Sequence, residues 1–152
     1  MIAPPYRVAL AVVLIDQISK AWALHHLAGR GIQPLLPGLL QQQLVFNTGA
    51  AFSMLSGNSA ALGMVSALVA IALGVWIQTA GPLRRLQWLG LGLLLGGAIG
   101  NGIDRWRLGR VVDFLEFMPI SFPVFNGADV AINLAVACLV LDAVRQHDAR
   151  PR

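Results

Sequence analysis

Charged side chains are scarce in this sequence. Only 12% of its 152 residues are Asp, Glu, Lys or Arg, whereas 57% are hydrophobic, and an ordinary soluble domain is about a quarter charged. No charged residue lies between Arg30 and Arg84. Because so short a chain exposes a large fraction of its surface, it could not bury this much apolar area in one water-soluble core. The composition therefore predicts an integral membrane protein.

Residues for several common kinds of chemistry are missing as well. Cys138 is the only cysteine, which excludes an internal disulfide and a multi-cysteine metal site. The three histidines, His25, His26 and His147, show no zinc-binding spacing, and neither a Gly-x-Ser-x-Gly elbow nor a P-loop is present. The net charge of +4 is spread between apolar runs instead of forming one patch, which argues against a nucleic-acid partner.

Four apolar runs dominate what remains, each close to the ~20 residues that a helix needs to cross a bilayer. They cover residues 8–24, 60–80, 86–103 and 128–144, and they predict an all-α fold of four transmembrane helices. The first run imitates a signal peptide, but Asp16 and Lys20 interrupt it, so we expect this segment to be retained.

The placement of arginine predicts the orientation in the membrane. If the chain crosses four times, the side of the two termini carries more arginines than the other side, so we expect both termini in the cytoplasm. The side of the termini carries Arg7, Arg84, Arg85, Arg145, Arg150 and Arg152. The opposite side carries Arg30, Arg105, Arg107 and Arg110.

The two outer connections are long, whereas residues 81–85 look like a plain inner turn. Residues 25–59 contain two apolar segments, 39–46 and 50–55, around Asn47-Thr48-Gly49. An Asn-x-Gly turn between apolar runs indicates a β-hairpin, so we expect a small extracytoplasmic hairpin or sheet platform, together with a short helix in an outer loop. Residues 104–127 hold most of the remaining charge, so we expect the chemistry on the outer face.

Asp16 and Lys20 lie four residues apart inside the first span and therefore share one face of that helix. Ionisable residues in a span are costly and usually face the interior of a bundle, paired with one another. Two interpretations stay open: an ion pair that only neutralises itself, or a pair that also supports a site.

The third span ends in Asn101, Asp104 and Arg105, whose spacing places them near one another at the outer end of the helix. A capping and anchoring role and a site role are both compatible with this spacing. Upstream, every fourth residue is a glycine, which favours close helix packing: Gly92, Gly96 and Gly100.

Two further carboxylates flank the outer loop: Asp113 in an apolar patch and Asp129 at the start of the fourth span. Asn126 and Asp129 also have the spacing of a capping box, which is a purely structural alternative. Two carboxylates brought together away from water share a proton, so that one can activate water while the other donates to a carbonyl oxygen. This is the chemistry of aspartic proteases, but the two positions alone do not establish it.

Five segments in order span residues 16–129: Asp16-Gln17-Ile18-Ser19-Lys20, then 47–52 (NTGAAF), 96–105 (GGAIGNGIDR), 111–114 (VVDF) and 122–129 (FPVFNGAD). Taken together, they resemble the lipoprotein signal peptidase family, also called signal peptidase II. The resemblance implies that Asp113 and Asp129 form a catalytic dyad. It also implies a set of residues that line or brace the site: Asp16, Lys20, Asn47, Gly49, Asn101, Arg105 and Asn126.

The same resemblance implies a single membrane-embedded peptidase domain over residues 1–152, monomeric, in the bacterial cytoplasmic (inner) membrane. The implied active site faces outward and needs no metal or organic cofactor. The implied substrate is a prolipoprotein, cut before a cysteine that carries diacylglycerol, with membrane lipid around it. We expect Asp104 to hold the outer loop by local pairing, and residues 106–121 are the candidate lid by position.

Two other functions compete with this one. A small transporter or channel would use Asp16, Lys20 and Asp129 to relay protons, although most polar residues gather toward one face of the membrane. An inactive assembly subunit would use the glycine ladder to dock partner helices, but this leaves Asp113 without a purpose.

Overall fold

The computed structural model of the protein describes residues 3–49 and 58–148. The elements follow in this order: α1 (Pro4–His26), β1 (Gln33–Leu36), β2 (Leu40–Asn47), α2 (Ser59–Thr79), α3 (Arg85–Leu108), β3 (Val111–Phe117) and α4 (Gly127–Asp148). All four helices are long and apolar enough to cross a membrane. Each predicted span coincides with one of them, and most of the helices extend a few residues beyond the predicted limits.

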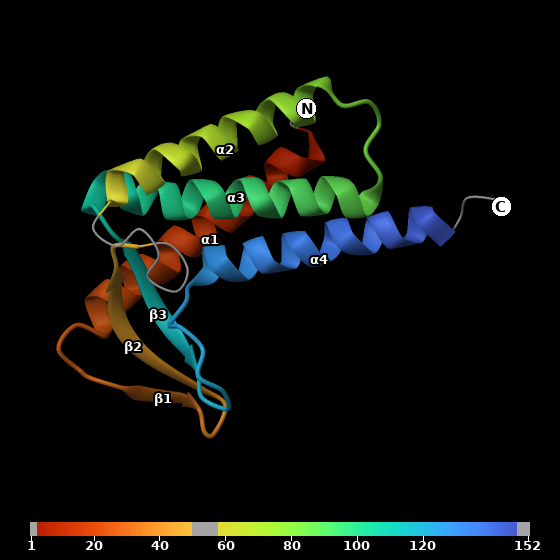
Figure 1. Cartoon of the computed structure of the whole chain (residues 1–152). Helices are drawn as coiled ribbons and strands as arrows, with labels where there is room; N and C mark the ends of the chain where they lie inside the picture. The colour runs from red at the N-terminus through yellow and green to blue at the C-terminus, as the bar shows by residue number, and fades with distance from the viewer. Residues whose placement is uncertain (1–2, 50–57, 149–152) are drawn as a thin grey trace.

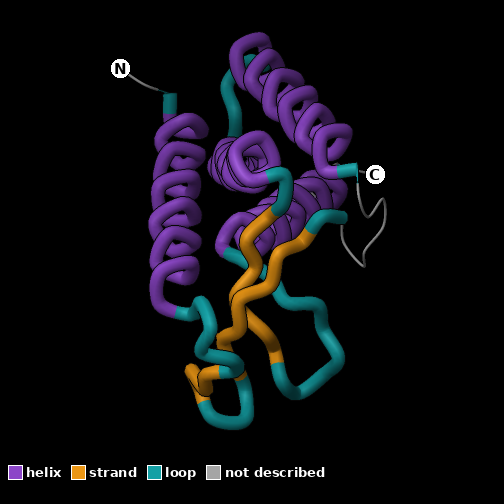
Figure 2. Tube along the Cα trace, turned by 90° about the vertical axis from the view of Figure 1, so that its left-hand side faces the viewer, coloured by secondary structure: helices purple, strands orange, loops and turns teal. Residues whose placement is uncertain are grey.

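Helix α3 is the centre of the bundle. It packs against α1, α2 and α4, and Figure 1 shows it between α2 and α4 with α1 behind. Half of its most apolar window is buried inside the protein, compared with 22% in each of the other three helices. The three strands project from one end of the bundle, whereas α1 begins and α4 ends toward the other end (Figure 1). In the perpendicular view of Figure 2, the strands extend well below the helices.

Glycine makes this central position possible. Gly92 and Gly96 face α1, whereas Gly90 and Gly97 face α4, so neighbouring helices approach α3 from two sides. A Cβ atom on Gly96 would lie only 2.6 Å from Cβ of Val12, which is closer than real carbon atoms come. These glycines therefore serve close helix packing, as predicted for the glycine ladder, because any side chain at these positions would push the helices apart.

The sheet is antiparallel, with the strand order β1-β2-β3. The described hairpin of the sheet joins β1 to β2 and therefore precedes Asn47-Thr48-Gly49, where β2 ends. The hairpin turn occupies residues 37–39, where Gly38 has a φ of +74° that favours glycine. The second predicted hairpin segment, residues 50–55, lies outside the described residues.

Strand β3 changes the expected picture of the second outer connection. Residues 106–121 contain the last turn of α3 and all of β3, so most of the segment predicted as a lid is regular structure, and its strand pairs with β2. The described residues of the outer connections contain no separate short helix. A local apolar pattern did not reveal this strand, because its partner lies far away in the sequence.

Replacing Gly96 with alanine should destabilise the bundle, because the new methyl group overlaps Val12 of α1. We expect a loss of ~1–3 kcal/mol in the free energy of unfolding, as for other overpacked cores. Gly74→Ala in α2 is the matched control, since nothing lies within 4 Å of its Cβ position. Thermal unfolding in detergent, followed by circular dichroism, measures both, and equal melting temperatures would contradict the packing argument.

Candidate active site

Asp113 lies in β3 with only 2% of its surface exposed. Its carboxylate accepts hydrogen bonds from two amide side chains: Nδ2 of Asn126 at 2.6 Å on Oδ1, and Nδ2 of Asn47 at 3.1 Å on Oδ2. Asn47 comes from the end of β2, the strand paired with β3. Strand pairing and the start of α4 therefore bring these groups together from three separate parts of the chain.

Asp129 lies in the first turn of α4, where it forms the predicted capping box with Asn126. The backbone N–H of Asp129 donates to Oδ1 of Asn126 at 3.0 Å, and the backbone N–H of Asn126 donates to Oδ2 of Asp129 at 3.1 Å. The structural alternative is thus confirmed, but it leaves the amide group of Asn126 free to reach Asp113. One asparagine caps the helix and links the two carboxylates, so a capping role and a site role coexist.

The surroundings of Asp113 favour its protonated form and raise its pKa. Burial, followed by the charge of Asp129, raises the pKa of Asp113 to about 6 from an ordinary 3.8. The hydrogen bonds from Asn47 and Asn126 and the positive charge of Lys20 act in the opposite direction. Because Asp113 senses the charge of Asp129, the two carboxylates are coupled, and the raised pKa of Asp113 lets the pair keep one proton up to a pH of about 6.

Lys20 supplies a buried positive charge beside this pair. Its Nζ atom lies 2.9 Å from Oδ2 of Asp16, 3.0 Å from Oδ2 of Asp104 and 2.9 Å from Oδ1 of Asn101. Because an ammonium group only donates hydrogen bonds, it holds the oxygen of the Asn101 amide toward itself. The amide nitrogen of Asn101 then donates to Oδ1 of Asp129 at 2.8 Å.

The two acidic partners of Lys20, Asp16 and Asp104, each bind the backbone N–H directly before Asp129 or Asp113. Oδ1 of Asp16 accepts from the N–H of Ala128 at 2.9 Å, one residue before Asp129. Oδ2 of Asp104 accepts from the N–H of Val112 at 3.1 Å, one residue before Asp113. Asp104 therefore does more than the local pairing that we predicted, because it also joins α1 through Lys20.

Gln17 was not predicted as a site residue. Its Nε2 atom lies 3.1 Å from Oδ2 of Asp16 and 3.0 Å from Oδ1 of Asp104. Gln17 therefore donates hydrogen bonds to both carboxylates that pair with Lys20. Its position inside the first matching segment, next to Asp16, was the only signal in the sequence.

Arg105 and Gly49 act one step further from the carboxylates. Nη2 of Arg105 donates to the carbonyl oxygen of Gly49 at 2.8 Å, and the N–H of Gly49 donates to Oδ1 of Asn47 at 2.9 Å. The amide of Asn47 is thereby oriented with its nitrogen toward Asp113. The structure thus brings all nine predicted site residues into one connected set.

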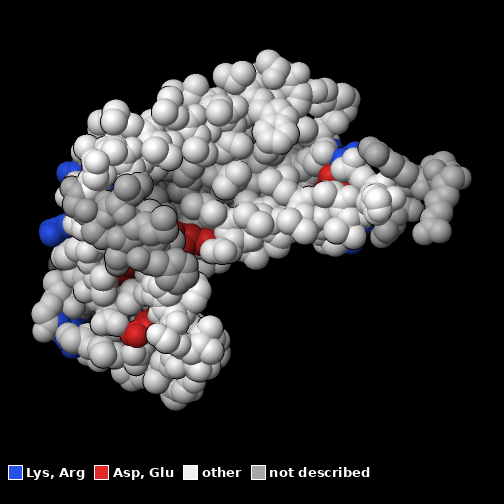
Figure 3. All heavy atoms as spheres, in the orientation of Figure 1, with Lys and Arg blue, Asp and Glu red and all other residues white. Residues whose placement is uncertain are grey.

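The surface view agrees with this arrangement. Acidic atoms are visible in the hollow where the bundle meets the sheet, while basic atoms lie at the edges of the molecule (Figure 3). Within the ranges 3–49 and 58–148, no three His, Cys, Asp or Glu side chains come together in a way that could hold a metal ion.

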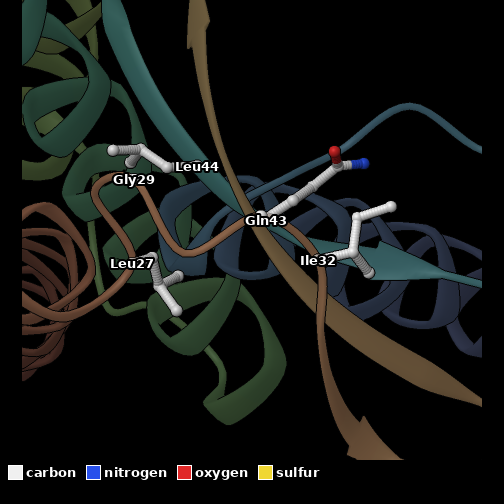
Figure 4. A pocket seen from close by; sticks show the side chains of 6 residues that line it. Leu27, Gly29, Ile32, Gln43 and Leu44 are labelled. Carbon is white, nitrogen blue, oxygen red and sulfur yellow. The ribbon is translucent and has the colours of Figure 1, made fainter.

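A small pocket of about 190 Å³ lies elsewhere, between β2 and the connection from α1 to β1. Leu27 and Ile32 come from that connection, and Gln43 and Leu44 from β2 (Figure 4). Its lining contains no ionisable side chain, so it is no candidate for acid–base chemistry.

The fold and the site together define a multi-pass membrane protein in which a buried carboxylate, Asp113, and a half-buried one, Asp129, are linked through Asn126 at the sheet end of the bundle. Two solved structures, each described as a bacterial membrane enzyme, share this fold. One has a TM-score of 0.86 and 26% identity and covers 97% of this chain and 92% of its own. The other has a TM-score of 0.82 and 28% identity and covers 91% of each chain.

The sequence comparisons narrow this class to one family. Residues 8–145 match the family described as signal peptidase (SPase) II. A lipoprotein signal peptidase of Synechococcus sp. (strain RCC307) is 51% identical over 140 residues, which are 91% of this chain and 93% of the relative. One of Gloeobacter violaceus is 44% identical over 143 residues, covering 94% and 83%. The chain therefore belongs to the signal peptidase II family, as its motifs predicted, and it is a membrane peptidase.

Removing the charge of Lys20 should strongly destabilise the protein, because Asp16 and Asp104 would remain buried without a cation. We expect Lys20→Met to cost ~3–5 kcal/mol of unfolding free energy. The double variant Asp16→Asn/Lys20→Met should recover part of that loss, since one of the two uncompensated charges is gone.

Arg85→Met, which removes an exposed cation at the start of α3, is the control and should change little. Chemical or thermal unfolding of the four proteins in the same detergent provides the comparison. If the double variant is less stable than Lys20→Met, charge compensation is not what Lys20 contributes.

Proposed function

We propose that the protein is an aspartic endopeptidase that removes the signal peptide from prolipoproteins, cutting before a cysteine that carries diacylglycerol. The observation that carries the proposal is that buried Asp113 and half-buried Asp129 belong to one hydrogen-bonded network at the end of a transmembrane bundle. Relatives named lipoprotein signal peptidase support the substrate class.

In this mechanism Asp113 carries the shared proton and Asp129 accepts one from water. The raised pKa of Asp113 supports the first role, because a protonated carboxyl can donate to the carbonyl oxygen of the scissile bond as water attacks. The ionised carboxylate of Asp129 is suited to the second role, since Asn101 and the Asn126 backbone both donate to it. The apolar surroundings strengthen these interactions by excluding water.

The other polar residues position this pair. Asn126 sets the relation between the two carboxylates directly, and Asn101 transmits the orientation that Lys20 imposes. Arg105 holds the segment after Asn47 through Gly49. Every step of the reaction uses side chains and water, so the proposal includes no metal and no organic cofactor.

We place the protein in the bacterial inner membrane as a monomer with one domain over residues 1–152. The arginine distribution supports cytoplasmic termini, and the sheet then lies on the outer side with the carboxylate pair. Several apolar side chains of the sheet and its turns are exposed, which suits a platform resting against the membrane surface: Ile32, Leu35, Leu36, Leu39, Met118 and Ile120.

Cleavage of a diacylglyceryl-modified prolipoprotein by purified protein tests the proposal. We expect Asp113→Asn and Asp129→Asn to lower kcat by ~10²–10⁴-fold, because each removes one member of the acid–base pair. Asp142→Asn is the matched control: Asp142 pairs with Arg84, near the C-terminal end of α4, and its loss should leave cleavage near the wild-type rate. Circular dichroism establishes that all three variants fold, and near-normal cleavage by folded Asp113→Asn would refute the dyad.

The pH dependence of cleavage gives a separate test. Because the protonated form of Asp113 is required and its pKa is about 6, kcat/KM should fall as the pH rises through about 6, tenfold per further unit. The stability of the fold should depend on pH in the same direction. The contribution of Asp113 to the free energy of unfolding is fully present below the ordinary pKa near 3.8 and is lost as the pH rises through about 6.

Asn47→Ala should move the fall in kcat/KM to higher pH, since the hydrogen bond that it removes favours the ionised form of Asp113. Gln41→Ala, which removes a bond to Glu116 on the same sheet, should leave the position of the fall unchanged. A fall at the same pH in Asn47→Ala and wild type would show that Asp113 does not control this part of the profile.

A further inference from the structure

An apolar groove of about 340 Å³ runs between α2 and α3. It lies on the side of α3 turned away from the carboxylate pair, because in an α-helix Ile103 points about 160° away from Asn101 and from Arg105. Most of the residues that line it are small or apolar, among them Ala67, Ala70, Ile99 and Gly102. The two largest side chains of the lining, Trp106 and Arg107, lie at its outer end. It is therefore separate from the proposed active site.

The size and lining of the groove fit a hydrocarbon chain. Its volume is about eleven times the roughly 30 Å³ that one water molecule occupies in the liquid, which leaves room for part of an acyl chain. Water would find few polar partners there, because Ser66 is the only hydroxyl in the lining and Arg107 the only charge. The groove narrows where Gly102 approaches Ser66, since a Cβ on Gly102 would lie 3.2 Å from that of Ser66.

The outer end of the groove carries an uncommitted positive charge. Arg107 is exposed and forms no ion pair with any carboxylate of residues 3–49 and 58–148. The neighbouring cations are engaged elsewhere: Arg105 donates to Gly49, and Arg110 lies 3.7 Å above the ring of Phe46. Trp106 is 63% exposed beside Arg107, and tryptophan at the end of a span favours the level of the lipid headgroups.

We propose that this groove is a binding site for one anionic phospholipid of the leaflet next to the sheet, with an acyl chain between α2 and α3 and the phosphate on Arg107. Arginine suits a phosphate because its planar guanidinium offers two parallel donors. The bound chain would lie along Ala67 and Ala70 of α2 and Ile99 of α3, and so contact both helices.

Native mass spectrometry of the detergent-purified full chain, titrated with phosphatidylglycerol or phosphatidylcholine, tests the site. We expect the wild type to retain one phosphatidylglycerol in preference to phosphatidylcholine. Arg107→Gln should reduce that preference by about fivefold, the effect of one basic residue at an anionic surface. Ala67→Trp should abolish retention of either lipid by filling the groove, and Arg110→Gln, a nearby cation outside the groove, should match the wild type.

Three results would overturn the proposal: unchanged retention in Arg107→Gln and Ala67→Trp, competition by inorganic phosphate as effective as by the lipid, or a wild-type dimer that Ala67→Trp disrupts. The second result would indicate a site for free anions, and the third a second copy of the chain as the occupant. Because binding is measured without any substrate, the outcome does not depend on the proposed cleavage reaction.

Discussion

The buried ammonium group of Lys20 is the interaction on which the rest of the site depends. In hydrocarbon it cannot be solvated by water, so three side-chain oxygens from α1 and α3 take the place of water. Each carboxylate among them has a second task at the backbone that leads to Asp113 or Asp129. The same set of contacts therefore neutralises the charge of Lys20 and aligns the two segments that carry Asp113 and Asp129.

This constraint explains the unusual composition of α3. A helix that must touch α1, α2 and α4 at once cannot carry bulky side chains on every face, and glycine meets that requirement on the sides of α1 and α4. Close approach in turn lets short side chains such as those of Asn101 and Asp104 reach across to α1 and to the start of α4. Small residues for packing and polar residues for the site are two aspects of one interface.

Much of this arrangement was predictable, because its signals are local. The four spans follow from apolar length, the cap of α4 from the spacing of Asn126 and Asp129, and the Asp16–Lys20 pair from helical periodicity. Strand β1 was missed because it is only four residues long and contains Pro34, and strand β3 because its partner β2 lies far away in the sequence. Gln17 and the wider role of Asp104 were missed for the same reason: their partners lie on another helix.

The order of the site residues along the chain has a consequence for biosynthesis. Asp16 and Lys20 lie on α1, which leaves the ribosome before the segment at the start of α4 that carries Asn126 and Asp129. A nascent chain that has inserted three helices lacks both the cap of α4 and one carboxylate of the pair. The proposed peptidase would thus be inert throughout its own synthesis and would acquire activity in a single step, when the fourth helix enters the membrane.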